Sequence, residues 1–525
     1  FSDLAGAFIA IGFLFDAKWE TFVLLAIAAV MAMGLGAAVT AALSILWWPR
    51  VDGSSSRVRS ALAGIAVVVA VLGYFARAGR QHVPEPASLA PQTLERTPPI
   101  LWIVIDTLRA DTFYGEALDF PLAPETGAFA DDSLVFSNAE STAGWTIPSL
   151  AALLTGIHNT TTDASAGFLP DWAPSIASRL SVAGYSTHAL VDNVIIEPRN
   201  GFGAGFDTFF QRSGYRFAFS LPTFRLLPTA LRESIRGVLR TSYLGSRGLT
   251  DQAIRVIESA ETPPFVFVHY MDPHAPYHLH PELGEFAEEN DEDAVNYYYF
   301  RDILRADEPK VPTDGQVAWL KHRYENEVRA LDRDLGRLFR AWTERFGDTG
   351  MVLLTADHGE EFMDHGHLGH GITLNREMVH VPLILRLPAD LSSEGRTIET
   401  PVSLVDVVQT TADLIDLDLT LDDGVRVQGT SWLPWLQGDA TPVTRPLVSG
   451  HSRNGRRVQR VREGHWAYIL NMFYDDRPRF VELYDLDADP REQNDLSQAL
   501  GAKRAEMEKK LGRLIRALIE LRDDD

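Results

Sequence analysis

Two widely separated apolar segments of the chain each end at an acidic residue. The run Ile103–Ile105 stops at Asp106, and the run Leu353–Ala356 stops at Asp357, which His358 follows. In a protein of alternating strands and helices, such residues lie where buried strands emerge at the carboxyl edge of a sheet, and two such edges can share one metal ion. Two carboxylates and an imidazole suit a divalent ion such as Zn²⁺, Mn²⁺, Ca²⁺ or Mg²⁺, and the ligand types do not choose among them.

A hydroxyl residue between these segments could complete the chemistry. Thr146 stands two positions before Pro148, which leads a helical pattern, so Thr146 can lie at a helix N-terminus where an anionic group would dock. A threonine hydroxyl is a weak nucleophile and needs a metal ion to stabilise its alkoxide. The alternative role for Thr146 is a structural helix cap.

Five segments, in this order, resemble the sulfatase branch of the alkaline phosphatase superfamily. They are 103–111, 144–156, 268–277, 353–360 and 364–371, the last followed by 381–384. Each segment alone is common, whereas the five together distinguish the family. The resemblance extends over residues 100–496 and implies an alkaline-phosphatase-like α/β fold with metal-dependent hydrolase or transferase activity.

The resemblance also implies a metal centre and a nucleophile. The implied ligands of one divalent ion are Asp106, Thr146, Asp357 and His358. Thr146 occupies the position of the family nucleophile. We therefore expect catalysis through a covalent intermediate on Thr146.

Histidines in two further segments match family positions that contact the anionic group or protonate the leaving oxygen. They are His274 and His370, and histidine suits both tasks because its charge is tunable near neutral pH. The other expected substrate-binding residues are Asp272 and Trp145. The second choices for the histidine roles are His269, Asp272, His365 and His367. So many His and Asp side chains in two loops could instead hold a second metal ion.

Two positions depart from true sulfatases. Those enzymes convert a Cys or Ser to formylglycine within a Cys/Ser-x-Pro-x-Arg frame, whereas this chain reads Thr146-Ile147-Pro148-Ser149-Leu150. Thr107 stands where many sulfatases have another metal-binding aspartate. A threonine nucleophile is similar to those of nucleotide pyrophosphatase/phosphodiesterases, lipoteichoic acid synthase and phosphoethanolamine transferases.

These departures favour phosphodiester hydrolysis or phospho-group transfer. One alternative is a sulfuric ester hydrolase that works without formylglycine. The other is a catalytically inactive, membrane-tethered binding protein, which the intact set of ligand-type residues argues against.

The sequence over 100–440 predicts a largely parallel α/β sheet, whose elements would position these residues. Short apolar runs such as Phe265–Val268 and Met351–Leu354 alternate with helical stretches, which predicts a sheet covered by helices on both faces. Apolar residues at three- and four-residue spacing predict a long helix over 314–346. Residues 441–525 form a predicted C-terminal subdomain with strands at 456–460, 465–470 and 480–484 in a small antiparallel sheet, followed by a helix over 501–521.

Residues 1–80 have the pattern of transmembrane helices that are truncated at the start. Thr21–Trp48 is uncharged, 58–76 is a second candidate, and 4–15 resembles the remnant of a third. Arg50, Arg57 and Arg59 assign the loop between the two main helices to the cytoplasm, so the catalytic domain is expected on the extracytoplasmic side of a membrane. Five prolines in 81–99 predict an extended tether.

The net charge and the absence of cysteine limit the partners and the chemistry that the protein can have. Of the formal net charge of −23, residues 100–525 carry −24, which excludes ordinary nucleic-acid binding. The absence of cysteine excludes disulfides, thiol catalysis and Cys-ligated zinc. The expected partners are a lipid bilayer and an anionic ester substrate, and the anchoring alone suggests a lipid head group or an envelope polymer.

Overall fold

The computed structural model divides the chain into two units, 1–82 with 213–243, and 83–212 with 244–525. The described residues all belong to the second unit, and they are 89–211, 245–283 and 311–523, with gaps at 116, 163, 171, 279, 281–282, 392–394, 421–426, 438–443 and 476. The predicted transmembrane segments and residues 81–88 of the tether lie outside the described residues. Within those ranges, no helix combines the length and hydropathy of a membrane-spanning segment.

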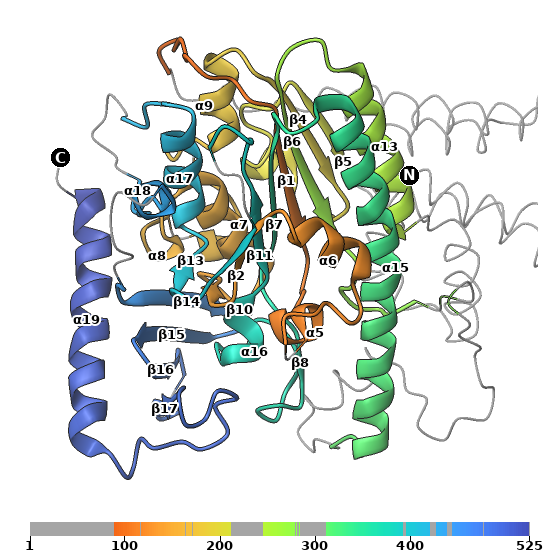
Figure 1. Ribbon diagram of the computed structural model, residues 1–525. Coiled ribbons are helices and arrows are strands. Elements are labelled where there is room, and N and C mark those ends of the chain that lie inside the picture. The colour runs from red at the N-terminus through yellow and green to blue at the C-terminus, as the bar shows by residue number, and fades with distance from the viewer. Residues whose placement is uncertain are drawn as a thin grey trace, which may run out of the picture. The chain divides into compact units, whose positions relative to one another are not determined.

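An eight-stranded sheet forms the centre of this unit (Figure 1), in the order β12-β2-β11-β7-β1-β6-β4-β5. The strands are β1 Ile100–Ile105, β2 Leu134–Phe136, β4 Ser186–Val191, β5 Thr208–Gln211, β6 Pro264–Tyr270, β7 Met351–Ala356, β11 Leu383–Arg386 and β12 Arg396–Ile398. Only β11 runs antiparallel to its neighbours, so the sheet is mostly parallel, as predicted. Every residue of β1, β6 and β7 is buried, which explains their uninterrupted apolar runs.

The strand register sets the position of the candidate metal ligands. Ile105 pairs with Ala356 of β7 on one side and with Tyr270 of β6 on the other. Asp106 and Asp357 therefore follow adjacent parallel strands at the same level. Both carboxylates emerge at one edge of the sheet, as the sequence predicts.

Helices cover both faces of the sheet (Figure 1). On one face lie α6 Pro124–Ala130, α13 Gly245–Ser259 and α15 Asp314–Phe346, and on the other lie α7 Thr146–Thr155, α9 Ile176–Val182 and α17 Asp406–Leu414. Helix α15 has the predicted bounds, and a capping box starts it: Thr313 Oγ1 accepts from Gln316 N, and Gln316 Oε1 accepts from Thr313 N. Its buried stripe includes Leu320, Val328 and Leu335.

The C-terminal part forms a second, antiparallel sheet in the order β14-β15-β16-β17. Its strands are β14 Leu447–Arg453, β15 Arg456–Glu463, β16 Trp466–Phe473 and β17 Phe480–Asp485, and α19 Gly501–Asp523 follows. The three predicted strands are confirmed, but the prediction missed β14. Only the first two residues of β14, Leu447 and Val448, are apolar, so the sequence gives no strand signal there. The strand instead docks on the catalytic domain. Gly450 N donates to Thr142 O (2.8 Å), and Ser449 Oγ donates to Ser141 O (2.6 Å).

Smaller elements connect these layers. They are α5 Ala110–Tyr114, β3 Ala139–Glu140, α8 Asn159–Thr162, the 3₁₀ helices Ala164–Ala166 and Pro198–Asn200, β8 Glu361–Phe362, β9 Leu368–Gly369, α16 Arg376–Val379, β10 His380–Val381, β13 Val402–Ser403 and α18 Leu433–Leu436. Strands β10, β3 and β13 form a small three-stranded sheet, and β8 pairs with β9.

Candidate active site

The four expected metal ligands meet at the carboxyl edge of β1 and β7. Potential ligand atoms of Asp106, Asp357 and His358 lie within 4.8 Å of one another, and all three side chains are fully buried. Nε2 of His358 is 3.7 Å from Asp106 Oδ1 and 3.5 Å from Asp357 Oδ2. Thr146 Oγ1 lies 3.4 Å from the same nitrogen.

The surroundings of Asp357 fit a bound cation. Its Oδ1 accepts hydrogen bonds from the backbone N–H groups of Thr107 (3.2 Å) and His358 (2.8 Å). Its Oδ2 is buried and, among the described residues, accepts no hydrogen bond. A buried carboxylate oxygen without a partner is costly, and a divalent ion would neutralise it together with Asp106.

His358 is oriented to present a lone pair to this group. Its Nδ1 is 2.8 Å from the carbonyl oxygen of Gly359, which can only accept, so Nδ1 carries the proton and Nε2 faces the carboxylates. Burial lowers the pKa of His358 below its ordinary value, although the charge of Asp357 acts to raise it. The ring is therefore neutral at neutral pH, as a metal ligand must be.

A side chain that the sequence interpretation missed orients Asp106. Asn193 follows β4, and its Nδ2 donates to Asp106 Oδ2 at 2.7 Å. The apolar run at the end of β4 also stops at polar residues, which is the same signal that identified Asp106. Thr107, the next residue after Asp106, has φ +61°, a strained conformation for a β-branched residue. This turn directs the Thr107 N–H toward Asp357.

Thr146 is the first residue of α7, as the sequence predicts, and it is almost completely buried. Trp145 precedes the helix in an extended conformation. The first turn of α7 is fixed to the metal-ligand edge, because Ser149 Oγ and Ser141 Oγ both donate to the carbonyl oxygen of Asp357 at 2.5 Å. The hydroxyl of Thr146 therefore lies beside the ligand group and at the positive end of a helix.

His370 and His274 lie on the same side of the site as His358. The ring of His370 is 4.8 Å from that of His358 and 4.9 Å from that of His274, measured between centroids. Nδ1 of His370 is 3.1 Å from Oε1 of Glu360, which is fully buried. A carboxylate at Nδ1 fixes the orientation of the ring. Glu360 belongs to the Asp-His-Gly-Glu segment, but its contact with His370 forms only when the loop between them folds back.

Asp272, another expected residue, has a structural partner, because its Oδ2 accepts from Ser246 N (2.7 Å) in the first turn of α13. His269 is fully buried, and its Nε2 lies 3.8 Å from Asp357 Oδ2, which is beyond hydrogen-bond distance. The backbone N–H of His367 donates to Oε1 of Glu361.

A second group of ligand-type side chains consists of Glu361, His365 and Glu377. His365 Nδ1 is 2.8 Å from Glu377 Oε1, and Nε2 is 2.6 Å from the carbonyl oxygen of Glu492. Burial acts to lower the pKa of His365, but these two acceptors raise it to about 9. Both ring nitrogens of His365 thus face hydrogen-bond acceptors, Glu377 Oε1 and the carbonyl oxygen of Glu492.

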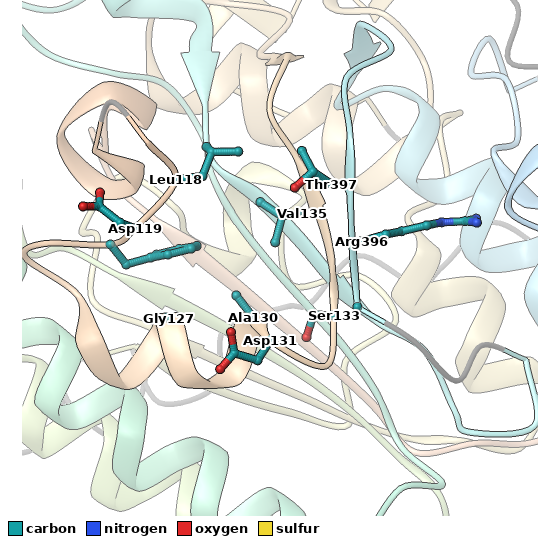
Figure 2. Close-up of a pocket in the computed structure, with 11 residues that line it drawn as sticks. Leu118, Asp119, Gly127, Ala130, Asp131, Ser133, Val135, Arg396 and Thr397 are labelled. Atoms are coloured by element: carbon teal, nitrogen blue, oxygen red, sulfur yellow. The ribbon is translucent and has the colours of Figure 1, made fainter.

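A cavity of about 310 Å³ opens elsewhere, beside the edge strand β12 and its neighbour β2 (Figure 2). Its lining residues lie in 118–135 and 395–397 and include Asp119, Ser133 and Arg396. None of them belongs to the candidate active site.

Comparisons with known proteins identify the family of the chain. Residues 98–417 match the family model described as Sulfatase. Arylsulfatase K from Xenopus laevis is 25% identical over 218 residues, which are 39% of this chain and 38% of that protein. The uncharacterized sulfatase YidJ of Escherichia coli (strain K12) is 24% identical over 357 residues, or 62% and 69% of the two chains.

Solved structures share the fold. The phosphonate monoester hydrolase of Agrobacterium radiobacter superimposes with a TM-score of 0.62 and 18% identity, over 80% of this chain and 95% of that one. The corresponding enzyme from Silicibacter pomeroyi gives a TM-score of 0.58 and 19% identity, over 79% and 94% of the two chains. The family match covers more than half of the 525 residues, and enzymes of this family typically bind a divalent metal. The chain therefore belongs to the sulfatase family of hydrolases.

Proposed function

We propose that the protein is a metal-dependent enzyme that cleaves or transfers phosphoesters through a covalent intermediate on Thr146. The observation that carries this proposal is the position of the Thr146 hydroxyl, which starts α7 and lies 3.4 Å from Nε2 of His358. Two buried carboxylates adjoin the same nitrogen. A cation held by these groups would stabilise the alkoxide form of the threonine, which is the nucleophile.

The side chains of the site can be assigned to the two steps of the reaction. As an alkoxide, Thr146 attacks phosphorus, so that the Oγ–P bond forms and the bond to the leaving oxygen breaks. His370, or His274 beside it, donates a proton to that oxygen. Water or an acceptor alcohol then attacks phosphorus and restores Thr146, which makes the enzyme a hydrolase or a transferase respectively. When bound, the divalent ion would supply Lewis-acid stabilisation of the negative charge.

Sulfate-ester hydrolysis is the second candidate. Relatives with 22–25% identity are named arylsulfatases. Against this reading, the chain has Thr146 and Leu150 where the formylglycine frame requires Cys or Ser and Arg. The threonine therefore favours phosphorus chemistry.

We also propose that the N-terminal segments anchor the enzyme in a lipid bilayer, with the catalytic domain on the extracytoplasmic side. The uncharged run Thr21–Trp48 and the arginines that follow it support this topology. A lipid head group or an envelope polymer would then be within reach as substrate. Alkaline carbonate should leave the full chain in the membrane fraction, and release into the supernatant would contradict the anchoring.

A side-by-side assay separates the candidate reactions. The purified full chain is tested on an aryl phosphodiester, an aryl phosphomonoester and an aryl sulfate, with Thr146→Ala as the control. We expect the highest kcat/KM on a phosphoester and loss of that activity in Thr146→Ala. Preference for the aryl sulfate would favour the second candidate, and equal turnover by Thr146→Ala would contradict the proposed nucleophile.

A further inference from the structure

The strand β14 brings residues of the C-terminal sheet to the candidate active site. Its backbone bonds to 141–142, the segment that leads to Thr146, through Gly450 N and Ser449 Oγ. Further along β14, Nδ1 of His451 accepts from the backbone N–H of Gly144 at 3.3 Å. The end of β14 is therefore held next to the residues that precede α7.

Arg453, the last residue of β14, lies between the two segments that carry the candidate nucleophile and acid. Its Cζ is 4.8 Å from the ring centroid of Trp145, the residue before Thr146. A Cβ on Gly371, the residue after His370, would overlap Nη1 of Arg453. The guanidinium thus lies against Trp145, which precedes Thr146, and against Gly371, which follows His370, and Gly371 leaves the space that it fills.

The chemistry of this position is that of an anion receptor. An arginine is positively charged at any working pH, and its planar fork can bind two oxygens of a phosphoryl or sulfuryl group. The ring of Trp145 offers a flat apolar surface that holds the guanidinium by a cation–π contact.

The local sequence supplies no cation of its own. The frame 146–150 ends at Leu150 and contains neither Lys nor Arg. Arg453, from the C-terminal sheet, would supply a positive charge that this frame lacks.

We infer that Arg453 binds the non-bridging oxygens of the anionic ester group at Thr146 and so determines which esters the enzyme accepts. This inference rests on the proposed site, but it does not require that Thr146 be the nucleophile. The alternative is that Arg453 only holds the β14–β15 hairpin against the catalytic domain.

Binding of inorganic phosphate to the metal-loaded full chain tests this assignment. Calorimetry would compare the wild type, Arg453→Met, Arg453→Lys and Thr146→Ala. The matched control is Arg457→Ala, because Arg457 pairs with Ser452 on the opposite face of the same hairpin. We expect Arg453→Met to weaken phosphate binding at least tenfold and to lower kcat/KM on the aryl phosphodiester by about 10²–10³-fold, the usual cost of losing one donor to a developing anion.

The controls separate this inference from the proposed function. Arg457→Ala should leave phosphate affinity unchanged. If Thr146→Ala keeps full turnover while Arg453→Met loses phosphate binding, the nucleophile assignment fails and the anion-receptor assignment stands. If Arg453→Met folds and binds phosphate within about twofold of wild type, Arg453 is structural and the inference is wrong.

If Arg453→Met does not fold, the Arg453→Lys variant tests whether Arg453 binds the anion. Lysine keeps the charge and removes the two-pronged geometry. A fall of several-fold in phosphate affinity supports the assignment, and wild-type affinity overturns it.

Discussion

Replacement of Asp357 by asparagine should stabilise the metal-free protein and reduce the extra stability that metal binding provides. The substitution keeps the size of the side chain and an oxygen that can accept from Thr107 N and His358 N. It removes the negative charge at Oδ2, which is buried without a hydrogen-bond partner among the described residues. Without metal, Asp357 and Asp106 are two carboxylates in one buried group. We therefore expect the free energy of unfolding of the metal-free protein to rise by about 1–3 kcal/mol, the usual cost of an unsatisfied buried polar group.

The same substitution should weaken metal binding. Loss of a side chain that only supports a ligand already costs about 10–100-fold in affinity, so loss of a charged ligand should cost at least about 100-fold. At a metal concentration 100 times the wild-type Kd, the ion stabilises the wild type by about 2.7 kcal/mol. A variant with a Kd 100-fold higher would gain only about 0.4 kcal/mol from the same concentration.

The assay is urea unfolding of both proteins in chelator and in each candidate metal, with direct titration of the ion by calorimetry. Asp314→Asn is the matched control, because Asp314 is an exposed aspartate in the first turn of α15. It should leave the metal-induced stabilisation unchanged. If the ion stabilises Asp357→Asn as much as the wild type, Asp357 is not a ligand and the reasoning fails.

Three further substitutions test the surrounding groups. Asn193→Leu removes the donor to Asp106 Oδ2 and should raise the metal Kd by about 10–100-fold, whereas an unchanged Kd in calorimetry would contradict the orienting role. Glu360→Gln should slow alkyl phosphoesters more than aryl phosphoesters, because a poor leaving group depends most on a well-oriented His370, and equal slowing of both would argue against that role. The pKa of His365 is raised to about 9 in the folded protein, above an unfolded value of about 6.5, so the stabilisation is complete below pH 6.5 and is lost as pH rises through about 9. His365→Asn should flatten this fall in urea unfolding measured from pH 6 to 10, and a fall as steep as in the wild type would exclude His365 as its cause.

Much of the fold and the metal-ligand group could be predicted because the signals are local. A buried parallel strand is an unbroken apolar run, so its polar end is visible in the sequence at Asp106 and at Asp357. The long helix at 314–346 was also visible, because its core-facing stripe repeats every three to four residues.

The rest depends on contacts between distant segments. Strand β14 shows no alternation of apolar and polar residues, and its backbone is hydrogen-bonded to the catalytic domain. Arg453 reaches the site only through that docking. The hydrogen bond from Asn193 to Asp106 crosses from one strand end to another, and Glu360 meets His370 only after the loop at 361–369 folds back. The expected metal ligands are thus encoded in short motifs, whereas the side chains that would orient them or bind the substrate are brought together only by the tertiary structure.

The central claim is that Thr146 becomes covalently phosphorylated during turnover. The most direct measurement is mass spectrometry of the peptide that contains Thr146, after rapid quenching with a slowly turned-over aryl phosphodiester. The account predicts added phosphoryl mass on Thr146, loss of the label in a folded Thr146→Ala variant, and partial activity in Thr146→Ser, because serine retains the hydroxyl. A label on a histidine, or full turnover by Thr146→Ala without any label, would contradict the account and leave Thr146 as a structural residue at the start of α7.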